Sequence, residues 1–307
     1  MHAITVESWG SPPAFGTVET PTAPPPDSSL VQVKVLAAGL HSLVRAQASG
    51  AHYSVKNARL PYIPGSDGVG TLADGTVVYF SSMLLGGAFA EYVNVPKADV
   101  KALPAGADPV QVAGLVNPGM SSWMAFKARV DNLPKAFSVV ILGVTAISGK
   151  VAVNFSRLLG AGKVIGVARN VKEMEQLALD QSIVLKDPVE DTDYSALGDV
   201  DLILDYLYGP PALRLLNSLN SSRPTQYVQI GSVAGQEVSL SAGLLRSKDL
   251  TLRGTGPGSW TMEQFDKVLA GLLTAVSQLP KFDIKARKLE QAEEAWQDKR
   301  GRTVFVP

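Results

Sequence analysis

The feature of this chain with the clearest chemical potential is an apolar run that leads directly into a turn framed by two glycines. The segment reads Val139-Val-Ile-Leu-Gly143-Val-Thr-Ala-Ile-Ser-Gly149-Lys150. The apolar run predicts a buried strand, and the two glycines predict a sharp turn that opens a helix. Such a turn aims free backbone N–H groups and the positive end of a helix at a bound diphosphate. The usual dinucleotide fingerprint has three glycines, and Ala146 stands in the middle place here.

The pair Gly149-Lys150 also suggests the phosphate loop of nucleotide hydrolases. That loop has four residues between its glycines and a Ser or Thr after the lysine to hold magnesium. Five residues separate Gly143 from Gly149, and Val151 follows the lysine. The spacing therefore argues against a nucleotide hydrolase, and leaves a dinucleotide site or a tight strand–helix turn without a ligand.

The second predicted strand of this region ends in Ala168-Arg169-Asn170. In dinucleotide-binding folds, an Asp or Glu about twenty residues beyond the last glycine holds the 2′-hydroxyl of the adenosine ribose. No acid stands here, and the guanidinium of Arg169 offers a fork of donors that suits a 2′-phosphate. We therefore expect NADPH rather than NADH, the alternative being that Arg169 is a solvated surface residue.

The elements that must position these residues change character near residue 110. Before it, short β-rich runs alternate with Gly and Pro, at 3–7, 31–36, 75–80 and 88–95. The Asp74-Gly75 pair predicts a tight turn between two strands, with both central residues at positive φ. This portion predicts an antiparallel, partly barrel-like β domain.

After that point the pattern becomes strand–helix–strand. Continuous apolar runs at 139–142, 164–167, 202–204 and 227–230 suit parallel strands that are covered on both faces. Residues 149–159 have helical periodicity, and Gly160 supplies a stop. We expect a doubly wound parallel-sheet (Rossmann) domain, and the fold class is α/β. The last fifty residues predict a helix at 262–277, a strand near 282–288, a helix at 290–297 and a short strand at 303–306.

Composition excludes several classes of function. The chain has 307 residues, 28 basic and 28 acidic side chains, no cysteine and three histidines. A balanced charge argues against a nucleic-acid or membrane-surface partner, and the lack of cysteine removes thiolate zinc sites, iron–sulfur clusters and cysteine nucleophiles. We expect no metal, no secretory signal, no membrane span and a cytoplasmic protein. Short-chain reductases need a Tyr with a Lys four residues on, and none of the eight tyrosines has one.

Several motifs spread over the whole chain resemble those of the medium-chain dehydrogenase/reductase superfamily, in its zinc-free quinone oxidoreductase (ζ-crystallin-like) branch. They are 37–41 (AAGLH), 64–70 (PGSDGVG), 87–92 (GAFAEY), the 143–149 turn, 230–232 (IGS) and 254–256 (GTG). Zinc alcohol dehydrogenases of the superfamily carry a Gly-His-Glu ligand motif in the region of Pro64–Gly70, and this chain has none. The resemblance implies a GroES-like catalytic domain at 1–116 and 257–307, and a dinucleotide-binding domain at 117–256.

The resemblance also implies which residues hold the cofactor. Together with the turn and the strand end described above, the expected NADPH-binding residues are Ser121, Gly143, Thr145, Ala146, Ile147, Gly149, Arg169, Asn170, Gly231, Ser232, Gly254, Thr255 and Gly256. Asp205, at the end of a buried strand, is either a residue near the cofactor or a structural cap.

The chain departs from the family where the acceptor is expected. The family usually has Asn at the position of His41, and an Asp at that of Val44. We expect His41 and Tyr53 to be the catalytic residues, each as a donor to the acceptor, a task that water could also perform. His41 could instead donate to the nicotinamide amide, and core packing for His41 and rim packing for Tyr53 remain alternatives. Both, with Ser121, are expected near the nicotinamide.

The expected activity is zinc-independent hydride transfer from NADPH to a quinone or to an activated alkene such as an enone. Two other functions stay open. One is an enoyl-thioester reductase, for which Lys56 and Arg59 are a thin basic patch, and the other is a non-enzymatic NADPH-binding sensor or structural protein. The family further implies a homodimer or homotetramer, and the strand edge at 249–253 is the expected contact.

Overall fold

The computed structural model describes residues 1–83, 85–298 and 301–307, and the chain divides into two compact units. The first unit comprises residues 1–117 and 273–307, and the second comprises residues 118–272. The first holds a mixed sheet and the second a parallel sheet with helices on both faces, so the predicted α/β class is confirmed.

The first unit is mainly β-structure. Its strands are β1 (His2–Thr5), β2 (Ala14–Thr17), β3 (Leu30–Leu40), β4 (Asp67–Thr71), β5 (Val77–Ser81), β6 (Tyr92–Pro96), β7 (Val100–Ala102), β14 (Ile284–Lys288) and β15 (Arg302–Val306). Its helical segments are α1 (Ser42–Ala48), η1 (Tyr53–Val55), η2 (Lys97–Asp99), η5 (Leu289–Gln291) and α8 (Ala292–Gln297). Helix α2 (Pro109–Met124) begins in this unit and ends in the second, and α7 (Met262–Ser277) does the reverse.

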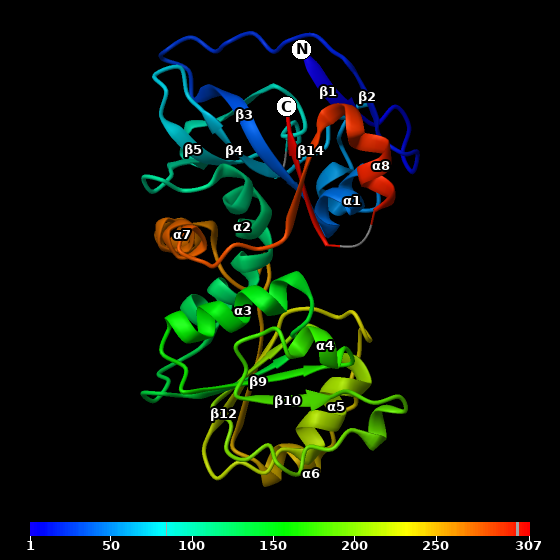
Figure 1. The fold of residues 1–307 in the computed structure, drawn as a ribbon, viewed down its shortest axis with the longest axis vertical. Helices are drawn as coiled ribbons and strands as arrows, with labels where there is room; N and C mark the ends of the chain where they lie inside the picture. The colour runs from blue at the N-terminus through cyan, green and yellow to red at the C-terminus, as the bar shows by residue number, and fades with distance from the viewer. Residues whose placement is uncertain (84, 299–300) are drawn as a thin grey trace. The chain divides into compact units, whose positions relative to one another are not determined.

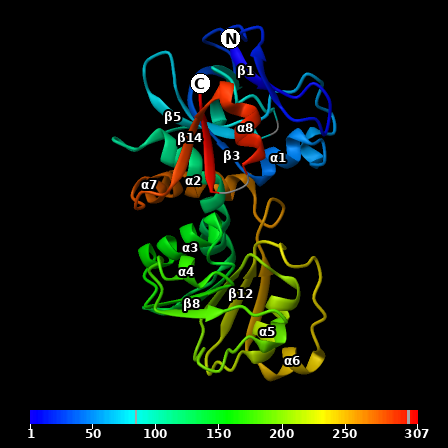
Figure 2. The ribbon, with the colours of Figure 1, turned by 45° about the vertical axis from the view of Figure 1, so that its right-hand side comes forward.

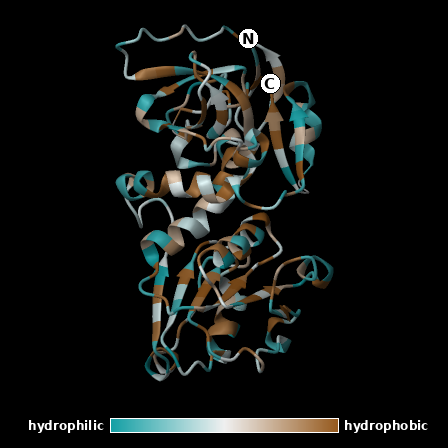
Figure 3. Ribbon diagram, turned by 60° about the vertical axis from the view of Figure 1, so that its left-hand side comes forward, coloured by the Kyte–Doolittle hydropathy of each residue, from teal (hydrophilic) through white to brown (hydrophobic). Residues whose placement is uncertain are grey.

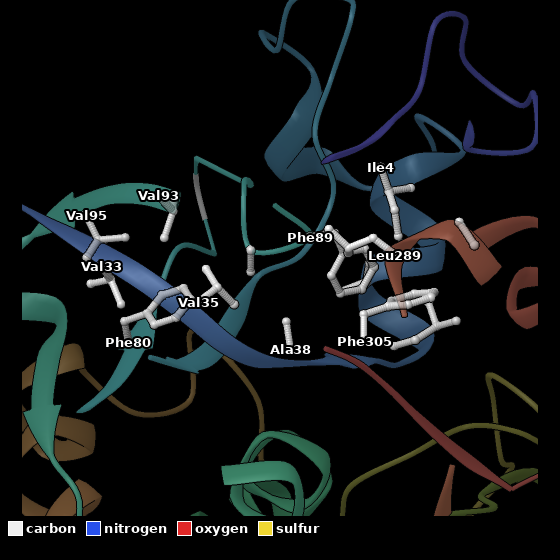
Figure 4. Close-up of a cluster of buried hydrophobic side chains, with 14 of the residues drawn as sticks. Ile4, Val33, Val35, Ala38, Phe80, Phe89, Val93, Val95, Leu289 and Phe305 are labelled. Atoms are coloured by element: carbon white, nitrogen blue, oxygen red, sulfur yellow. The ribbon is translucent and has the colours of Figure 1, made fainter. Parts of the chain in front are cut away.

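Strand β3 organises the seven-stranded sheet, whose order is β14-β15-β3-β4-β5-β7. Its first half pairs with β6 and its last residues pair with β15, both antiparallel, while β4 lies along its other edge. The core beside it is apolar and aromatic: the rings of Phe89 and Phe305 meet edge to face with centroids 4.9 Å apart. Figure 4 shows these two rings beside Leu289, below Ile4.

The predicted β4–β5 hairpin is present, but its expected turn is wrong in detail. Only Gly75 has a positive φ, at 85°. Asp74 instead accepts the backbone N–H of Thr76 on its Oδ1 at 2.9 Å, and the loop closes by a bond from Leu72 N to Thr76 O. A side chain that bonds two residues on stabilises this turn without a left-handed conformation at Asp74.

The second unit is a six-stranded parallel sheet. Its strands are β8 (Ser138–Leu142), β9 (Lys163–Ala168), β10 (Gln181–Val184), β11 (Leu202–Asp205), β12 (Thr225–Gln229) and β13 (Leu250–Gly254). Its helical segments are η3 (Ala125–Arg129), α3 (Ile147–Leu158), α4 (Val171–Met174), η4 (Val189–Asp191), α5 (Gly209–Ser218) and α6 (Ala242–Ser247). Several strands of this sheet show brown, hydrophobic segments (Figure 3).

Alternate residues of these strands pack on opposite faces. Val139 and Ile141 share a core with Ala152 of α3, whereas Val140 and Leu142 share a core with Leu215 of α5. Figure 1 shows α3 and α5 on opposite sides of the sheet, and the turned view in Figure 2 places α6 with α5. Burial on both faces explains the continuous apolar runs, and the sheet is doubly wound as predicted.

Candidate functional site

The order of the parallel strands determines where a ligand can enter the second unit. The sheet runs β10-β9-β8-β11-β12-β13, which is 3-2-1-4-5-6 in chain order. The order reverses between β8 and β11, and open sheets of this kind bind ligands in the crevice beyond the carboxyl ends of the strands at that point. The chain after β8 is the glycine-framed turn.

The two glycines of the turn have separate structural reasons. Gly143 has φ of 90°, which only glycine adopts readily, and its N–H donates to Val167 O on β9. A Cβ on Gly149 would lie 2.5 Å from the carbonyl oxygen of Gly143 and 2.7 Å from the Cα of Val144. The absence of a side chain at Gly149 therefore lets α3 start close against the end of β8.

Helix α3 begins with unsatisfied donors. Its N-cap, Ala146, has no side-chain bond to the first turn. The first N–H groups of a helix have no intrahelical acceptor, so those of Ile147, Ser148 and Gly149 stay available to an external one. Aligned peptide dipoles add positive potential at this point. This end of α3 suits a diphosphate.

A cavity of about 460 Å³ opens beside this turn. It brings together four predicted cofactor residues, Gly143, Thr145, Ala146 and Arg169. Its remaining lining is mostly apolar, with one further cation and one acid: Ala168, Leu185, Lys186, Asp187, Val189, Leu207, Pro211, Val233 and Ala234. The volume falls in the range of small-molecule sites, and an apolar wall beside a guanidinium and bare N–H groups fits the adenosine half of a phosphorylated dinucleotide.

Asn170 has a local structural task at the same strand end. Its Oδ1 accepts the N–H of Glu173 at 3.2 Å and its Nδ2 donates to Glu173 Oε1, so it caps α4. Glu173 also pairs with Lys150 at 2.8 Å. These contacts fix the chain that leaves β9, and Arg169 projects from just before the cap.

The other predicted cofactor residues lie at the ends of β12 and β13. Gly231 and Ser232 follow β12, and the N–H of Gly231 donates to Asp205 O. Gly254 ends β13, the N–H of Thr255 donates to Gln229 O, and that of Gly256 donates to Ser259 Oγ. The hydroxyl of Thr255 is buried without a partner in the described part of the chain. None of these residues lines the 460 Å³ cavity.

Ser121 and Asp205 are each tied into the second unit. Ser121 Oγ donates to Pro118 O and lies 3.5 Å from the hydroxyl of Tyr206. Asp205 is fully buried and accepts the N–H groups of Leu207 and Tyr208 and the hydroxyl of Tyr227. Burial raises the pKa of Asp205 although these bonds oppose the rise. Asp205 is therefore the structural cap of its strand end, one of its two predicted roles.

In the first unit, four neighbouring strands bring a buried polar cluster together. His41 follows β3, Ser66 and Asp67 open β4, Tyr79 lies on β5 and Arg302 begins β15. His41 Nε2 lies 3.0 Å from Asp67 Oδ1 and 3.2 Å from Ser66 Oγ, and the Tyr79 hydroxyl donates to Asp67 Oδ2 at 3.2 Å. His41 is 6% exposed and Asp67 3% exposed.

The charges of this cluster follow from its contacts. Burial works to raise the pKa of Asp67, but the hydrogen bonds from His41 and Ser66 and the positive charge of Arg302 outweigh it and lower that pKa. Burial lowers the pKa of His41. An ionised carboxylate only accepts hydrogen bonds, so Nε2 of a neutral His41 carries the proton. The atoms His41 Nδ1 and Arg302 Nη2 are buried without a partner in the described residues.

This cluster is not the arrangement of a serine hydrolase. A catalytic triad places serine on one imidazole nitrogen and the carboxylate on the other. Here Ser66 and Asp67 share Nε2. Within residues 1–83, 85–298 and 301–307, no group of three or more His, Asp or Glu side chains is placed to hold a metal ion.

Tyr53 lies on η1 and is 61% exposed, and its ring contacts that of His52 at a tilt of 36° with a centroid distance of 4.3 Å. Gln47, a fully buried residue of α1, anchors the segment that carries Tyr53. Its Nε2 donates to Ser54 Oγ and to Met83 O, both at 3.0 Å. A large aromatic side chain is thus presented to solvent on a firmly anchored turn.

Comparison with known proteins identifies the family. The probable NADPH-dependent quinone reductase tdiC of Emericella nidulans is 34% identical, and the match covers all of this chain and all of that protein. The chain belongs to the quinone oxidoreductase branch of the medium-chain dehydrogenase/reductase superfamily. The resemblance predicted from the motifs is therefore confirmed. A scan against protein-family models found no match.

Solved structures share the fold of this chain. A mycobacterial quinone oxidoreductase superposes with a TM-score of 0.81 at 19% identity, over the whole of both chains. The quinone oxidoreductase of Thermus thermophilus, which has been crystallised with NADPH, gives 0.76 at 20% identity, again over both whole chains. At these identities the likeness establishes the fold.

Two residues of this quinone oxidoreductase were not predicted from the sequence. Lys186, which lines the cavity with Arg169, follows β10, a strand whose residues Gln181-Ser-Ile-Val184 mix polar and apolar types. Gln47 lies within a helix that has no chemical motif, and only the fold shows that it anchors the turn of Tyr53.

No helix in the described part of the chain has the length and apolar character that a membrane crossing requires.

Proposed function

We propose that this protein is an NADPH-dependent reductase of quinones and of activated alkenes such as enones, and that it works without zinc. The observation that carries the proposal is the cavity in which the uncapped start of α3 lies beside Arg169, with no acid at the end of β9. The tdiC relative is described as NADPH-dependent and as acting on quinones.

Different residues of the second unit would bind different parts of the cofactor. The N–H groups of Ile147, Ser148 and Gly149 would hold the diphosphate, and Arg169 the 2′-phosphate. The apolar wall formed by Leu185, Val189, Leu207 and Pro211 would take the adenine. We assign the remaining contacts along the cofactor to Ser121, Gly231, Ser232 and Gly254–Gly256. When bound, the reduced nicotinamide supplies a hydride to an electron-poor acceptor.

On the acceptor side, we assign proton donation to Tyr53. A quinone that gains a hydride must also gain a proton at oxygen, and a phenol donor stabilises the charge that develops there. Tyr53 is exposed, so water can return its proton. In neutral His41 the protonated Nε2 is bonded to Asp67, so only Nδ1 can contact an acceptor molecule. Without a proton, Nδ1 accepts a hydrogen bond and cannot donate one. His41 would therefore position the acceptor or its hydroxyl product.

Zinc independence is supported by the donor set of the first unit. His41 and Asp67 bond to one another and to Ser66, and the chain has no cysteine to complete a tetrahedral site. The charge of buried Arg302 also acts on Asp67 and would repel a cation there. Oxidation of simple alcohols, which relies on zinc in the wider superfamily, is not expected.

The test follows the absorbance of NADPH: its consumption with quinones, enones and enoyl thioesters, and its formation from NADP⁺ with a secondary alcohol. The proposal expects turnover with quinones and enones that survives treatment with a chelator. Turnover confined to enoyl thioesters would assign the protein to the alternative reductase class. Tight NADPH binding with no turnover of any acceptor would leave a sensor or structural protein.

We also propose that the protein is a homodimer or homotetramer that pairs through β13. This strand is at the end of the six-stranded sheet, and Leu252 on it is 37% exposed. An unpaired strand edge with an apolar side chain is a template for pairing with a second copy. Sedimentation velocity at several concentrations measures the assembly, and a monomer at all of them would refute the proposal.

A further inference from the structure

The cavity beside α3 contains a second cation, Lys186, that the sequence did not single out. We propose that Lys186 and Arg169 together bind the 2′-phosphate of NADPH and that Lys186 is a specificity-determining residue for the cofactor. The inference rests on the proposed function, since it concerns the same cofactor. It adds a contribution from β10 to the one expected from β9.

The pairing of the two strands brings the segments that carry these two side chains out of the sheet next to one another. Strands β9 and β10 run parallel, with Val184 in register with Ala168. The N–H of Leu185 donates to Ala168 O at 2.9 Å, which extends the pairing by one more residue. Arg169 and Lys186 therefore follow the carboxyl ends of two neighbouring parallel strands, and both line the cavity.

Neither cation is committed to a protein partner. Nearby basic residues have carboxylates: Lys150 pairs with Glu173 at 2.8 Å and Arg157 with Asp180 at 2.6 Å. Among the residues that the structure describes, the side chains of Arg169 and Lys186 have no hydrogen bond or ion pair. Both side chains are exposed, and both remain free to bind an anion.

The backbone of Lys186 is nevertheless fixed. Its N–H donates to the hydroxyl of Thr192 at 3.0 Å, and Thr192 is fully buried. The stem of the side chain therefore starts from a fixed point at the rim of the cavity. A lysine anchored in this way places its ammonium group at a phosphate with less loss of freedom than one on a mobile loop.

The charge count gives a reason for two cations. Asp187 also lines the cavity, so a single cation would leave its rim neutral. With Arg169 and Lys186 together, the rim carries two positive charges and one negative charge. A phosphate dianion is favoured by that balance, whereas the 2′-hydroxyl of NADH gains nothing from it.

The experiment measures dissociation constants of NADPH and NADH by fluorescence titration in the purified full-length protein, without any acceptor. The variants are Lys186→Ala, Lys186→Glu, Lys186→Arg and Arg169→Ala. Lys135→Ala is the matched control, because Lys135 is exposed, precedes the amino end of β8 and does not line the cavity. Circular dichroism verifies that each variant is folded.

We expect Lys186→Ala to weaken NADPH binding about tenfold, because one charge-assisted contact is lost. The dissociation constant of NADH should stay within about twofold of the wild-type value. Lys186→Glu should lower the affinity for NADPH further, Lys186→Arg should keep it near that of the wild type, and Lys135→Ala should leave it unchanged. Unchanged NADPH affinity in Lys186→Ala and Lys186→Glu overturns the inference while the proposed function stands. A wild-type protein that binds neither coenzyme refutes the proposed function itself.

Discussion

The substitution Gly149→Ala isolates the contact between α3 and the end of β8. An alanine Cβ would lie 2.5 Å from Gly143 O and 2.7 Å from Val144 Cα, and both obstacles are backbone atoms that no side-chain rotation can move. Ordinary contact begins at 3.4 Å. The start of the helix must therefore move away from the turn by 3.4 − 2.5 = 0.9 Å, if it moves along that contact alone.

A shift of this size separates the N–H groups of Ile147 and Ser148 from the place where Gly143 turns the chain toward the cavity. A displacement of about 1 Å in a positioning element can cost about a hundredfold in function. We expect NADPH affinity to fall between about tenfold and a hundredfold, measured by fluorescence titration. The crowding should also lower the free energy of unfolding by about 1–3 kcal/mol.

The matched control is Gly243→Ala, in α6 of the same unit. A Cβ there meets only Ser241 Oγ, at 3.8 Å, so no atom has to move. Because alanine favours a helix over glycine, this variant should be as stable as the wild type or more stable by up to about 1 kcal/mol, with normal NADPH binding. If Gly149→Ala binds NADPH as tightly as Gly243→Ala does, the reasoning about the turn is wrong.

Three further outcomes follow from the structure. Tyr53→Phe should keep NADPH affinity within about twofold and lower kcat with a quinone by about a hundredfold, measured by stopped-flow absorbance; an unchanged kcat would remove Tyr53 as the proton donor. Burial holds the pKa of His41 below its ordinary 6.5, so the unfolded chain binds more protons below that value and stability should fall as the pH drops through it. His41→Asn should flatten this dependence in thermal melts between about pH 7 and pH 5, and an unchanged slope would contradict the assignment. Leu252→Lys on the β13 edge should convert the proposed homodimer or homotetramer to monomer in sedimentation velocity, while Leu245→Lys, at an exposed leucine of α6, should not.

The sequence was most informative where one physical requirement controls several residues in a row. The strands β8, β9, β11 and β12 are buried on both faces, so their apolar runs predicted them to within two residues at each end. The turn at Gly143 and Gly149 was equally readable, because positive φ and close packing each demand glycine. Local rules of this kind need no knowledge of the rest of the fold.

The sequence was least informative where burial is partial or a contact is distant. Strand β10 is an edge strand, its residues are only partly buried, and its mixed pattern gave no strand signal, so Lys186 was missed with it. The cluster around His41 draws on β3, β4, β5 and β15. Arg302 is 261 positions beyond His41 in the chain, and no periodicity connects two such residues. Asp205 could be read either as a residue near the cofactor or as a cap, and only the structure shows its cap bonds to Leu207 and Tyr208.

In the proposed complex, the diphosphate of NADPH lies against the first turn of α3, and its 2′-phosphate lies against the cations beyond β9 and β10. A crystal structure of the complex with NADPH tests this most directly. We predict diphosphate density within hydrogen-bonding distance of the N–H groups of Ile147, Ser148 and Gly149, and the 2′-phosphate beside Arg169 and Lys186. A cofactor bound elsewhere, or a 2′-phosphate directed into solvent away from both cations, would contradict the account.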